Sequence, residues 1–158
     1  MSYRNNEGYA DPTMGSAMSR MMKEYRQQRR EQRAKEDDAM NRKRVYMASP
    51  YAGDIEANTS SAVNYCKFII EKGCMPVASH LLYPQMLNDS DPQERFLGTM
   101  FGLALLRDCR EVWFFGTGMS PGMKREYEEA KRLRLKMRFF DENCEEVESC
   151  VFLNSSNN

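Results

Sequence analysis

The sequence lacks two features that would have assigned it to a protein class at once. It has no apolar run near the roughly 20 residues that a membrane-spanning helix requires. It also has no net charge, because 23 Lys and Arg residues balance 23 Asp and Glu residues. This balance argues against a protein that coats nucleic acid. The N-terminus has no apolar stretch of the kind that a secretory signal contains, so we expect a cytoplasmic protein.

The sequence also lacks the cysteine and histidine patterns that build disulfide frameworks or metal sites. Five cysteines make an odd number, and no two of them have CxxC spacing. The chain has a single histidine, His80. We therefore expect reduced thiols, and neither a disulfide framework, a metal nor a cofactor.

The first 44 residues contain no Ile, Leu, Val, Phe, Trp or Cys. They carry 11 basic and 7 acidic residues, whereas the remainder carries 12 and 16. A chain of 158 residues is long enough for one domain with an arm. We expect an arm over residues 1–43, a folded domain over residues 44–153 and a disordered tail over residues 154–158.

The arm divides into a segment without periodicity, residues 1–15, and a helix-forming segment, residues 16–40. We expect the first to be disordered or an expressed leader. Four methionines and a tyrosine recur at helical spacing: Met14, Met18, Met21, Met22 and Tyr25. This stripe is either a docking surface for a partner protein or a sister subunit, or one side of a solvated helix. Acidic residues dilute the basic ones, so nucleic-acid binding is not expected.

Beyond the arm, apolar strand-like segments alternate with helical patterns. Strands are expected at residues 45–48, 75–78, 111–115 and 136–140, with a candidate fifth at 150–153. Helices are expected at residues 54–72, 92–107 and 123–133, with residues 79–90 as a loop. The first helix presents Ala62, Tyr65, Cys66 and Ile69 on its apolar face, and the second presents Phe96, Met100, Leu103 and Leu106. This alternation predicts an α/β fold with a doubly wound, mostly parallel sheet of four or five strands, flavodoxin- or Rossmann-like.

In such folds, ligands bind beyond the carboxyl ends of the strands. The loop at residues 116–122 contains Gly118 and Gly122, which let a ligand approach the backbone, and Ser120 at a helix start. A helix N-terminus favours an anion such as phosphate. Glu126 follows one and a half turns later and can face the same cleft. From these residues alone, ordinary turn chemistry and a solvated glutamate are the preferred explanation of the pattern.

Residues 45–141 resemble the nucleoside 2′-deoxyribosyltransferase superfamily, which includes the 2′-deoxynucleoside 5′-monophosphate N-glycosidases. The matching residues are Tyr46 in Val-Tyr-Met-Ala-Ser-Pro-Tyr and the pattern Ser120-x-Gly122-x-x-x-Glu126-x-x-x-Ala130. Within the superfamily, the chain is most similar to a group of small bacterial and phage-type proteins. The resemblance implies that Glu126 is the nucleophile on the anomeric carbon, that Tyr46 orients it, and that Ser120 contacts a 5′-phosphate.

The resemblance therefore implies an N-glycosidase or deoxyribosyltransferase-like enzyme that acts on nucleotides, works without a cofactor and forms a homo-oligomer. His80 follows the second strand and could donate a proton or bind phosphate, although lone histidines are more often structural. Ser49 and Tyr51 form the first loop, in place of the phosphate grip of related enzymes. Tyr51 could stack on a base or pack on the domain.

One departure from the related enzymes supports an alternative. They carry an aspartate in the helix before the third strand, where this chain has Gly102-Leu103-Ala104. A nucleotide-binding or nucleotide-sequestering module with impaired catalysis is therefore the alternative function.

Overall fold

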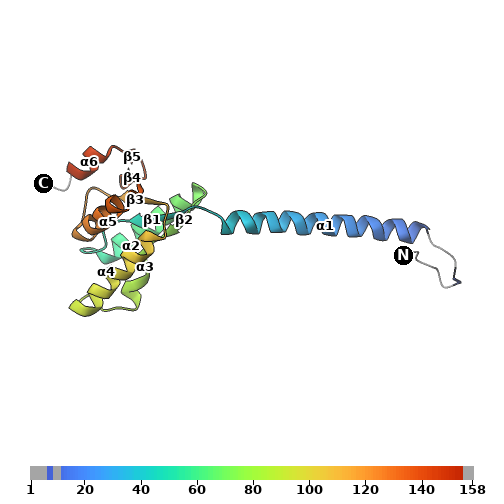
Figure 1. Ribbon diagram of the computed structural model, residues 1–158, viewed down its shortest axis with the longest axis horizontal. Helices are drawn as coiled ribbons and strands as arrows, with labels where there is room; N and C mark the ends of the chain where they lie inside the picture. The colour runs from blue at the N-terminus through green and yellow to red at the C-terminus, as the bar shows by residue number, and fades with distance from the viewer. Residues whose placement is uncertain (1–6, 9–11, 155–158) are drawn as a thin grey trace. The chain divides into compact units, whose positions relative to one another are not determined.

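The computed structural model describes residues 7–8 and 12–154 of the chain (Figure 1). The chain forms two compact units, Met1–Arg42 and Lys43–Asn158. Most of the segments predicted to be disordered, 1–15 and 154–158, lie outside the described residues.

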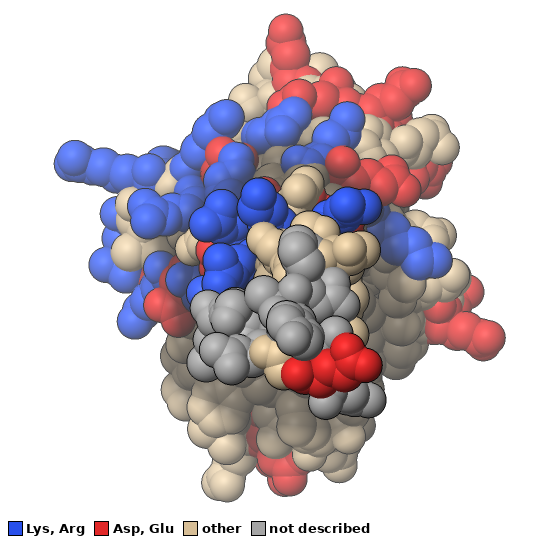
Figure 2. All heavy atoms as spheres, turned by 90° about the vertical axis from the view of Figure 1, so that its right-hand side faces the viewer, with Lys and Arg blue, Asp and Glu red and all other residues tan. Residues whose placement is uncertain are grey.

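The first unit contains one long helix, α1 (Pro12–Met40), which begins four residues before the predicted start. Its Met-rich stripe is exposed, with Met21 64% and Tyr25 56% accessible. Polar contacts between neighbouring turns support the helix; for example, Gln27 Nε2 donates to Glu31 Oε1 at 3.0 Å. In Figure 2, which looks from the right-hand side of Figure 1, basic and acidic side chains both occur on the visible face. In the described part of the chain, no helix has the length and apolar character needed to cross a membrane.

The second unit is built on a five-stranded sheet, in the order β2-β1-β3-β4-β5. The strands are β1 (Arg44–Ala48), β2 (Met75–Val77), β3 (Glu111–Phe115), β4 (Lys136–Phe140) and β5 (Glu146–Val147). The first four run parallel, and β5 pairs antiparallel with β4. The predicted α/β class with a mostly parallel sheet is confirmed.

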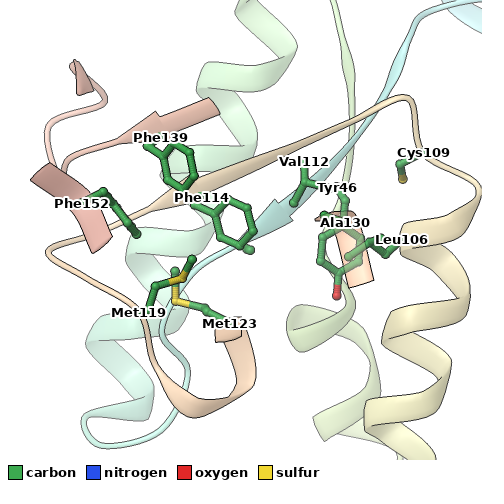
Figure 3. Close-up of a cluster of buried hydrophobic side chains, with 11 residues drawn as sticks. Tyr46, Leu106, Cys109, Val112, Phe114, Met119, Met123, Ala130, Phe139 and Phe152 are labelled. Carbon is green, nitrogen blue, oxygen red and sulfur yellow. The ribbon is translucent and has the colours of Figure 1, made fainter. Parts of the chain in front are cut away.

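Helices cover both faces of the sheet because side chains alternate along each strand. Val45 and Met47 of β1 pack with α2 (Ile55–Glu71) on one face. Tyr46 and Ala48 face the other side, toward α4 (Pro92–Arg107) and α5 (Pro121–Arg132). Figure 3 shows this second cluster, in which Phe114 and Phe139 stack at 5.3 Å between ring centroids.

Two local predictions are wrong. The stretch 79–90 is not only loop, because it holds the one-turn helix α3 (Ser79–Leu82) and the 3₁₀ helix η1 (Tyr83–Gln85). The candidate strand 150–153 lies in α6 (Ser149–Asn154), and the fifth strand is β5 instead. A run of four apolar residues does not distinguish strand from helix. Here the helix turns Phe152 onto Phe139, at 5.3 Å between ring centroids.

The predicted apolar faces of the two long helices have different outcomes. Ala62, Tyr65 and Ile69 of α2 are buried and Cys66 is half-buried, as predicted. For α4 the prediction is wrong, because only Leu106 of the predicted face is buried and Phe96 is 60% exposed. The side of α4 that packs on the domain carries glycines instead, since the helix lies too close to β1 and α3 for larger side chains.

Candidate functional site

A cleft with a volume of about 260 Å³ lies at the carboxyl ends of the parallel strands. The strand order reverses between β1 and β3, which is where doubly wound folds bind ligands. Six of the residues predicted for the site line this cleft: Ser49, Tyr51, His80, Ser120, Gly122 and Glu126. They come from the ends of β1 and β2 and from the start of α5, so the topology itself brings them together.

Glu126 is held by a short chain of hydrogen bonds that runs into the core. The hydroxyl of Tyr46, fully buried in β1, donates to Glu126 Oε1 at 2.7 Å. The same phenolic oxygen lies 2.7 Å from Ser79 Oγ. Because the single phenolic proton is directed at an ionised Glu126, the Ser79 hydroxyl must then donate to Tyr46. Figure 3 shows Tyr46 with its hydroxyl oxygen at the edge of the buried cluster.

Two glutamates of α5, three residues apart, have opposite environments. Burial raises the pKa of Glu126 from 4.5 to about 7, and the hydrogen bond from Tyr46 acts against this rise. Hydrogen bonds from Arg132 and Arg107 lower the pKa of Glu129 to about 2. A carboxylate with a strongly raised pKa in a cleft is typical of a functional site, whereas Glu129 joins α5 to α4.

Ser49 and His80 form a second polar pair in the cleft that Glu126 lines. His80 Nε2 lies 3.0 Å from Ser49 Oγ, and the rings of Tyr51 and His80 meet edge to face at 6.4 Å between centroids. Burial lowers the pKa of His80 to about 4, so the imidazole is neutral at physiological pH. It can therefore exchange hydrogen bonds with a ligand but does not supply a cationic site.

The start of α5 places the third group of predicted residues. Ser120 is the N-cap of the helix, and its Oγ accepts the Met123 N–H at 3.3 Å. Gly122 lies in the first turn and lines the cleft. Gly118, half-buried in the preceding loop, is outside the set of residues that line the cleft.

The wall formed by α4 was not predicted from the sequence. Gly98, Thr99 and Gly102 line it, together with Arg95, whose Nε lies 3.8 Å from Asp89 Oδ1. Of the predicted apolar stripe of α4, only Leu106 lies on the same buried side as Gly102. Ser79 was also missed, although it lies two residues after β2 in a loop predicted to border the site.

Gly102 is required by the close approach of α4 to the hydrogen-bonded chain. A Cβ at this position would lie 3.0 Å from Ser79 Oγ and 3.3 Å from Tyr46 Oη. We expect Gly102→Ala to destabilise the fold by about 1–3 kcal/mol and to displace Ser79, measured by urea denaturation. Gly98→Ala is the matched control, because its Cβ would meet Leu87 Cδ1 at an ordinary 3.4 Å and alanine favours the helix. Equal stability of the two variants would contradict this packing argument.

In residues 7–8 and 12–154, no group of three or more His, Cys, Asp or Glu side chains is placed to hold a metal ion. All five cysteines are free thiols. The cleft therefore offers one carboxylate with a raised pKa, a neutral imidazole and several hydroxyl groups, and the charged side chains of Asp89, Glu94 and Arg95 also line it.

Comparison with solved structures shows the fold of a deoxyribosyltransferase. The chain is similar to a 2-deoxyribosyltransferase from the psychrotolerant bacterium Bacillus psychrosaccharolyticus, with a TM-score of 0.54 and 12% identity over 70% of this chain and 82% of the other. A 2-desoxiribosyltransferase from Leishmania mexicana matches with a TM-score of 0.47 and 15% identity, over 63% of this chain and 64% of the other.

In sequence, no curated protein matches the chain. The model of one protein family, a domain of unknown function designated DUF7768, matches residues 43–140. This match spans the sheet from β1 to β4 and includes every residue of the site described above. The chain therefore belongs to the DUF7768 family.

Proposed function

We propose that the protein cleaves the bond between base and sugar of a nucleotide, as an N-glycosidase or a deoxyribosyltransferase-like enzyme, with Glu126 as the nucleophile. One observation carries this proposal: the Tyr46 hydroxyl donates to Glu126 Oε1 at 2.7 Å, at the edge of a cleft beyond the strand ends. The hydrogen bond fixes the carboxylate and favours its ionised form. The second oxygen of the carboxylate is then available to a sugar in the cleft.

The proposed reaction proceeds in two displacements. Glu126 attacks the anomeric carbon, a C–O bond forms, and the C–N bond to the base breaks. The base leaves with the electron pair of that bond and takes up a proton from the cleft or from solvent. Water then attacks the anomeric carbon and releases Glu126, which gives hydrolysis. If a second base attacks instead, the result is transfer.

We further propose that Ser120 contacts the 5′-phosphate of the substrate. Its hydroxyl lies at the N-terminus of α5, where the helix dipole favours an anion, and both Ser120 and Gly122 line the cleft. The neutral pair of Ser49 and His80 borders the same cleft and offers further hydrogen bonds to a polar substrate. Tyr51 is proposed to stack on the base.

The role of Ser120 can be separated from its role as a helix cap. Aspartate also accepts the N–H of Met123, but its charge repels a phosphate. We expect Ser120→Asp to lower kcat/KM for a deoxynucleoside monophosphate relative to the corresponding nucleoside by about 10-fold or more. Ser120→Ala is the matched variant, with no added charge and a stability loss of about 1 kcal/mol. An unchanged substrate ratio in Ser120→Asp would contradict the phosphate contact.

The activity itself is tested with a panel of deoxynucleotides, ribonucleotides and NAD-type dinucleotides, with free base resolved by chromatography. We expect base release by the wild-type protein from at least one class and none by Glu126→Ala. If no substrate releases base with either protein, the enzyme proposal is wrong. Adding a second free base to the reaction distinguishes transfer from hydrolysis.

A second candidate function is a module that binds or sequesters a nucleotide without cleaving it. The supporting observation is that α4 presents Gly102 to the cleft, in the stretch Gly102-Leu103-Ala104 where related enzymes carry an aspartate. Nucleotide binding in calorimetry, with no base release over long incubation, would favour this function over the first.

Two broader expectations remain proposals. The exposed Met-rich stripe of α1 supports a docking role toward a protein partner or a sister subunit. We also propose that the protein acts in the cytoplasm and belongs with small bacterial and phage-type proteins of the deoxyribosyltransferase-like superfamily. The cytoplasmic location and the place in this superfamily both fit the use of a small nucleotide as substrate.

A further inference from the structure

Two side chains at the ends of neighbouring strands form a pair that the two displacements described above leave without a catalytic role. Ser49 directly follows β1, and His80 lies three residues after the end of β2. Because β1 and β2 are parallel neighbours, their carboxyl ends lie at the same edge of the sheet. Ser49 Oγ therefore lies 3.0 Å from His80 Nε2. Ser49 is only 6% exposed, and the ring of Tyr51 meets the imidazole edge to face, so the pair is held in one arrangement.

The pair of Ser49 and His80 can take up a proton in either tautomer of the imidazole. With the N–H on Nε2, this nitrogen donates to Ser49 and Nδ1 is the accepting nitrogen. With the N–H on Nδ1, the Ser49 hydroxyl donates to Nε2, and its oxygen can accept a new proton as it gives up its own. Burial lowers the pKa of His80 to about 4, so the imidazole is unprotonated at neutral pH and ready to accept.

His80 lies next to the hydrogen-bonded chain that ends at Glu126. Its neighbour in sequence, Ser79, has its hydroxyl oxygen 2.7 Å from Tyr46 Oη, which in turn lies 2.7 Å from Glu126 Oε1. Glu126 enters the cleft from α5, whereas His80 enters it from the end of β2, and the cleft has a volume of about 260 Å³. A sugar attached to Glu126 therefore shares this small cleft with the imidazole of His80.

The three carboxylates that line the cleft are unsuited to act as the base of the second displacement. The carboxylate of Glu126 is itself esterified to the sugar at that stage. Glu94 lies about 12 Å along α4 from Gly102, the residue of this helix that approaches the hydrogen-bonded chain. Asp89, whose side chain is 57% exposed, pairs with Arg95 at 3.8 Å beside Glu94. Among the described residues that line the cleft, His80 is therefore the best placed base.

The second displacement requires a general base on the side of the sugar that the nucleobase has left. Water attacks the anomeric carbon from that side, opposite to Glu126, and must lose a proton as its C–O bond forms. The ester bond to Glu126 breaks, and its electron pair returns to the carboxylate. The proton of the water passes to the imidazole and from there to solvent.

We propose that His80 is the general base of the second displacement, which accepts a proton from the attacking water and makes the protein a hydrolase. This inference rests on the proposed function and adds to it the acceptor of the sugar. An imidazole with a lowered pKa is a weak base, so its contribution is set at about 100-fold, the lower end of the range for general bases.

Rapid-quench kinetics of His80→Gln tests this role. The substrates are deoxynucleoside 5′-monophosphates, and both the free nucleobase and the mass of the intact chain are followed. We expect the variant to release a single nucleobase per chain at close to the wild-type rate and then to turn over about 100-fold more slowly. The chain should accumulate with the sugar phosphate attached to Glu126. Glutamine keeps a hydrogen bond to Ser49 but cannot take up the proton.

Azide distinguishes a missing base from a damaged site, because this anion attacks the sugar without losing a proton. We expect sodium azide to restore the turnover of His80→Gln, with a sugar azide as the product, and to leave the wild-type rate little changed. Asp89→Asn is the matched control, because it removes another ionisable side chain from the lining of the cleft. This variant should turn over at the wild-type rate.

The outcomes separate this inference from the function on which it rests. A wild-type protein that releases no nucleobase would overturn the proposed function and the role of His80 with it. Wild-type turnover by His80→Gln, or an equal loss of the first and second displacements, would overturn the role of His80 alone. Accumulation of the sugar adduct in Asp89→Asn and not in His80→Gln would assign the base to Asp89.

Discussion

Replacing Glu126 by glutamine is expected to lower the rate of base release by at least about 1,000-fold, because the amide cannot form the covalent bond to the sugar. Glutamine keeps the size of the side chain and can still accept the hydrogen bond from Tyr46. The loss of rate therefore reflects the missing nucleophile, because the packing of the side chain is unchanged. Single-turnover assays with chromatographic detection of free base measure it directly.

Glu128→Gln is the matched control for this substitution. Glu128 lies two residues further along α5 and is exposed, so its replacement removes a carboxylate from the same helix without touching the cleft. We expect this variant to keep the wild-type rate. Equal losses in the two variants would assign the effect to the charge of the helix and would contradict a nucleophilic Glu126.

Tyr46 tests the same assignment through the pH dependence. Glu126 must be ionised to attack, so kcat/KM is expected to rise with pH through about 7, the pKa of this carboxyl. The hydrogen bond from Tyr46 lowers that pKa, and its loss in Tyr46→Phe raises it. The rising limb should therefore move to higher pH, with a rate about 10-fold lower at neutral pH and recovery in alkali. A merely structural Tyr46 would lower the rate equally at every pH.

The sheet could be predicted because the buried strands share one sequence pattern. Val112 to Phe115 of β3 are all buried, and a continuous apolar run is the pattern that a parallel strand covered on both faces requires. The starts of α2 and α4 could be predicted too, because Asp54 and Asp91 precede their apolar patterns, and a short acidic side chain there accepts backbone N–H groups of the first turn. Local chemistry decides both features.

The packed face of α4 could not be predicted, because periodicity finds the bulkiest stripe of a helix and not the side that touches the domain. The two differ here since Gly102 allows α4 to approach Ser79 and Tyr46, and this closeness is a property of the tertiary structure. The short strand β5 was missed for a similar reason. Its pairing with β4 depends on the turn after Phe140, where Asp141 accepts the N–H groups of Asn143 and Glu145.

The site was partly predictable. Loops at the carboxyl ends of parallel strands lie together by topology, which accounts for Ser49, His80 and Ser120 lining one cleft. The pattern that begins at Ser120 singles out Glu126, but the different environments of Glu126 and Glu129 could not be predicted from it. Burial raises the pKa of Glu126, and hydrogen bonds from Arg132 and Arg107 lower that of Glu129; both environments depend on how α5 packs.

The environment of Glu126 has a cost in stability that depends on pH. Its pKa is 4.5 in the unfolded chain and about 7 in the folded protein, so the folded protein binds this proton more tightly. The free energy of unfolding therefore falls as pH rises from 4.5 to about 7, by about 2–3 kcal/mol, and the loss persists above that range. His80, whose pKa falls to about 4 on folding, acts in the opposite direction between that value and 6.5. The contribution of Glu126 is therefore seen by comparing variants that all retain His80.

In Glu126→Gln the buried charge is absent at every pH. We expect this variant to match the wild type in stability near pH 4.5 and to exceed it by about 2–3 kcal/mol near pH 8, measured by urea denaturation at both values. Glu129→Gln should have the opposite effect and lower the stability at neutral pH, because the arginines favour the ionised form of that carboxyl. A Glu126→Gln variant that is less stable than the wild type near pH 8 would show that the carboxylate stabilises the fold. A more stable but inactive variant would mean that the folded protein gives up stability to keep this carboxylate in the cleft.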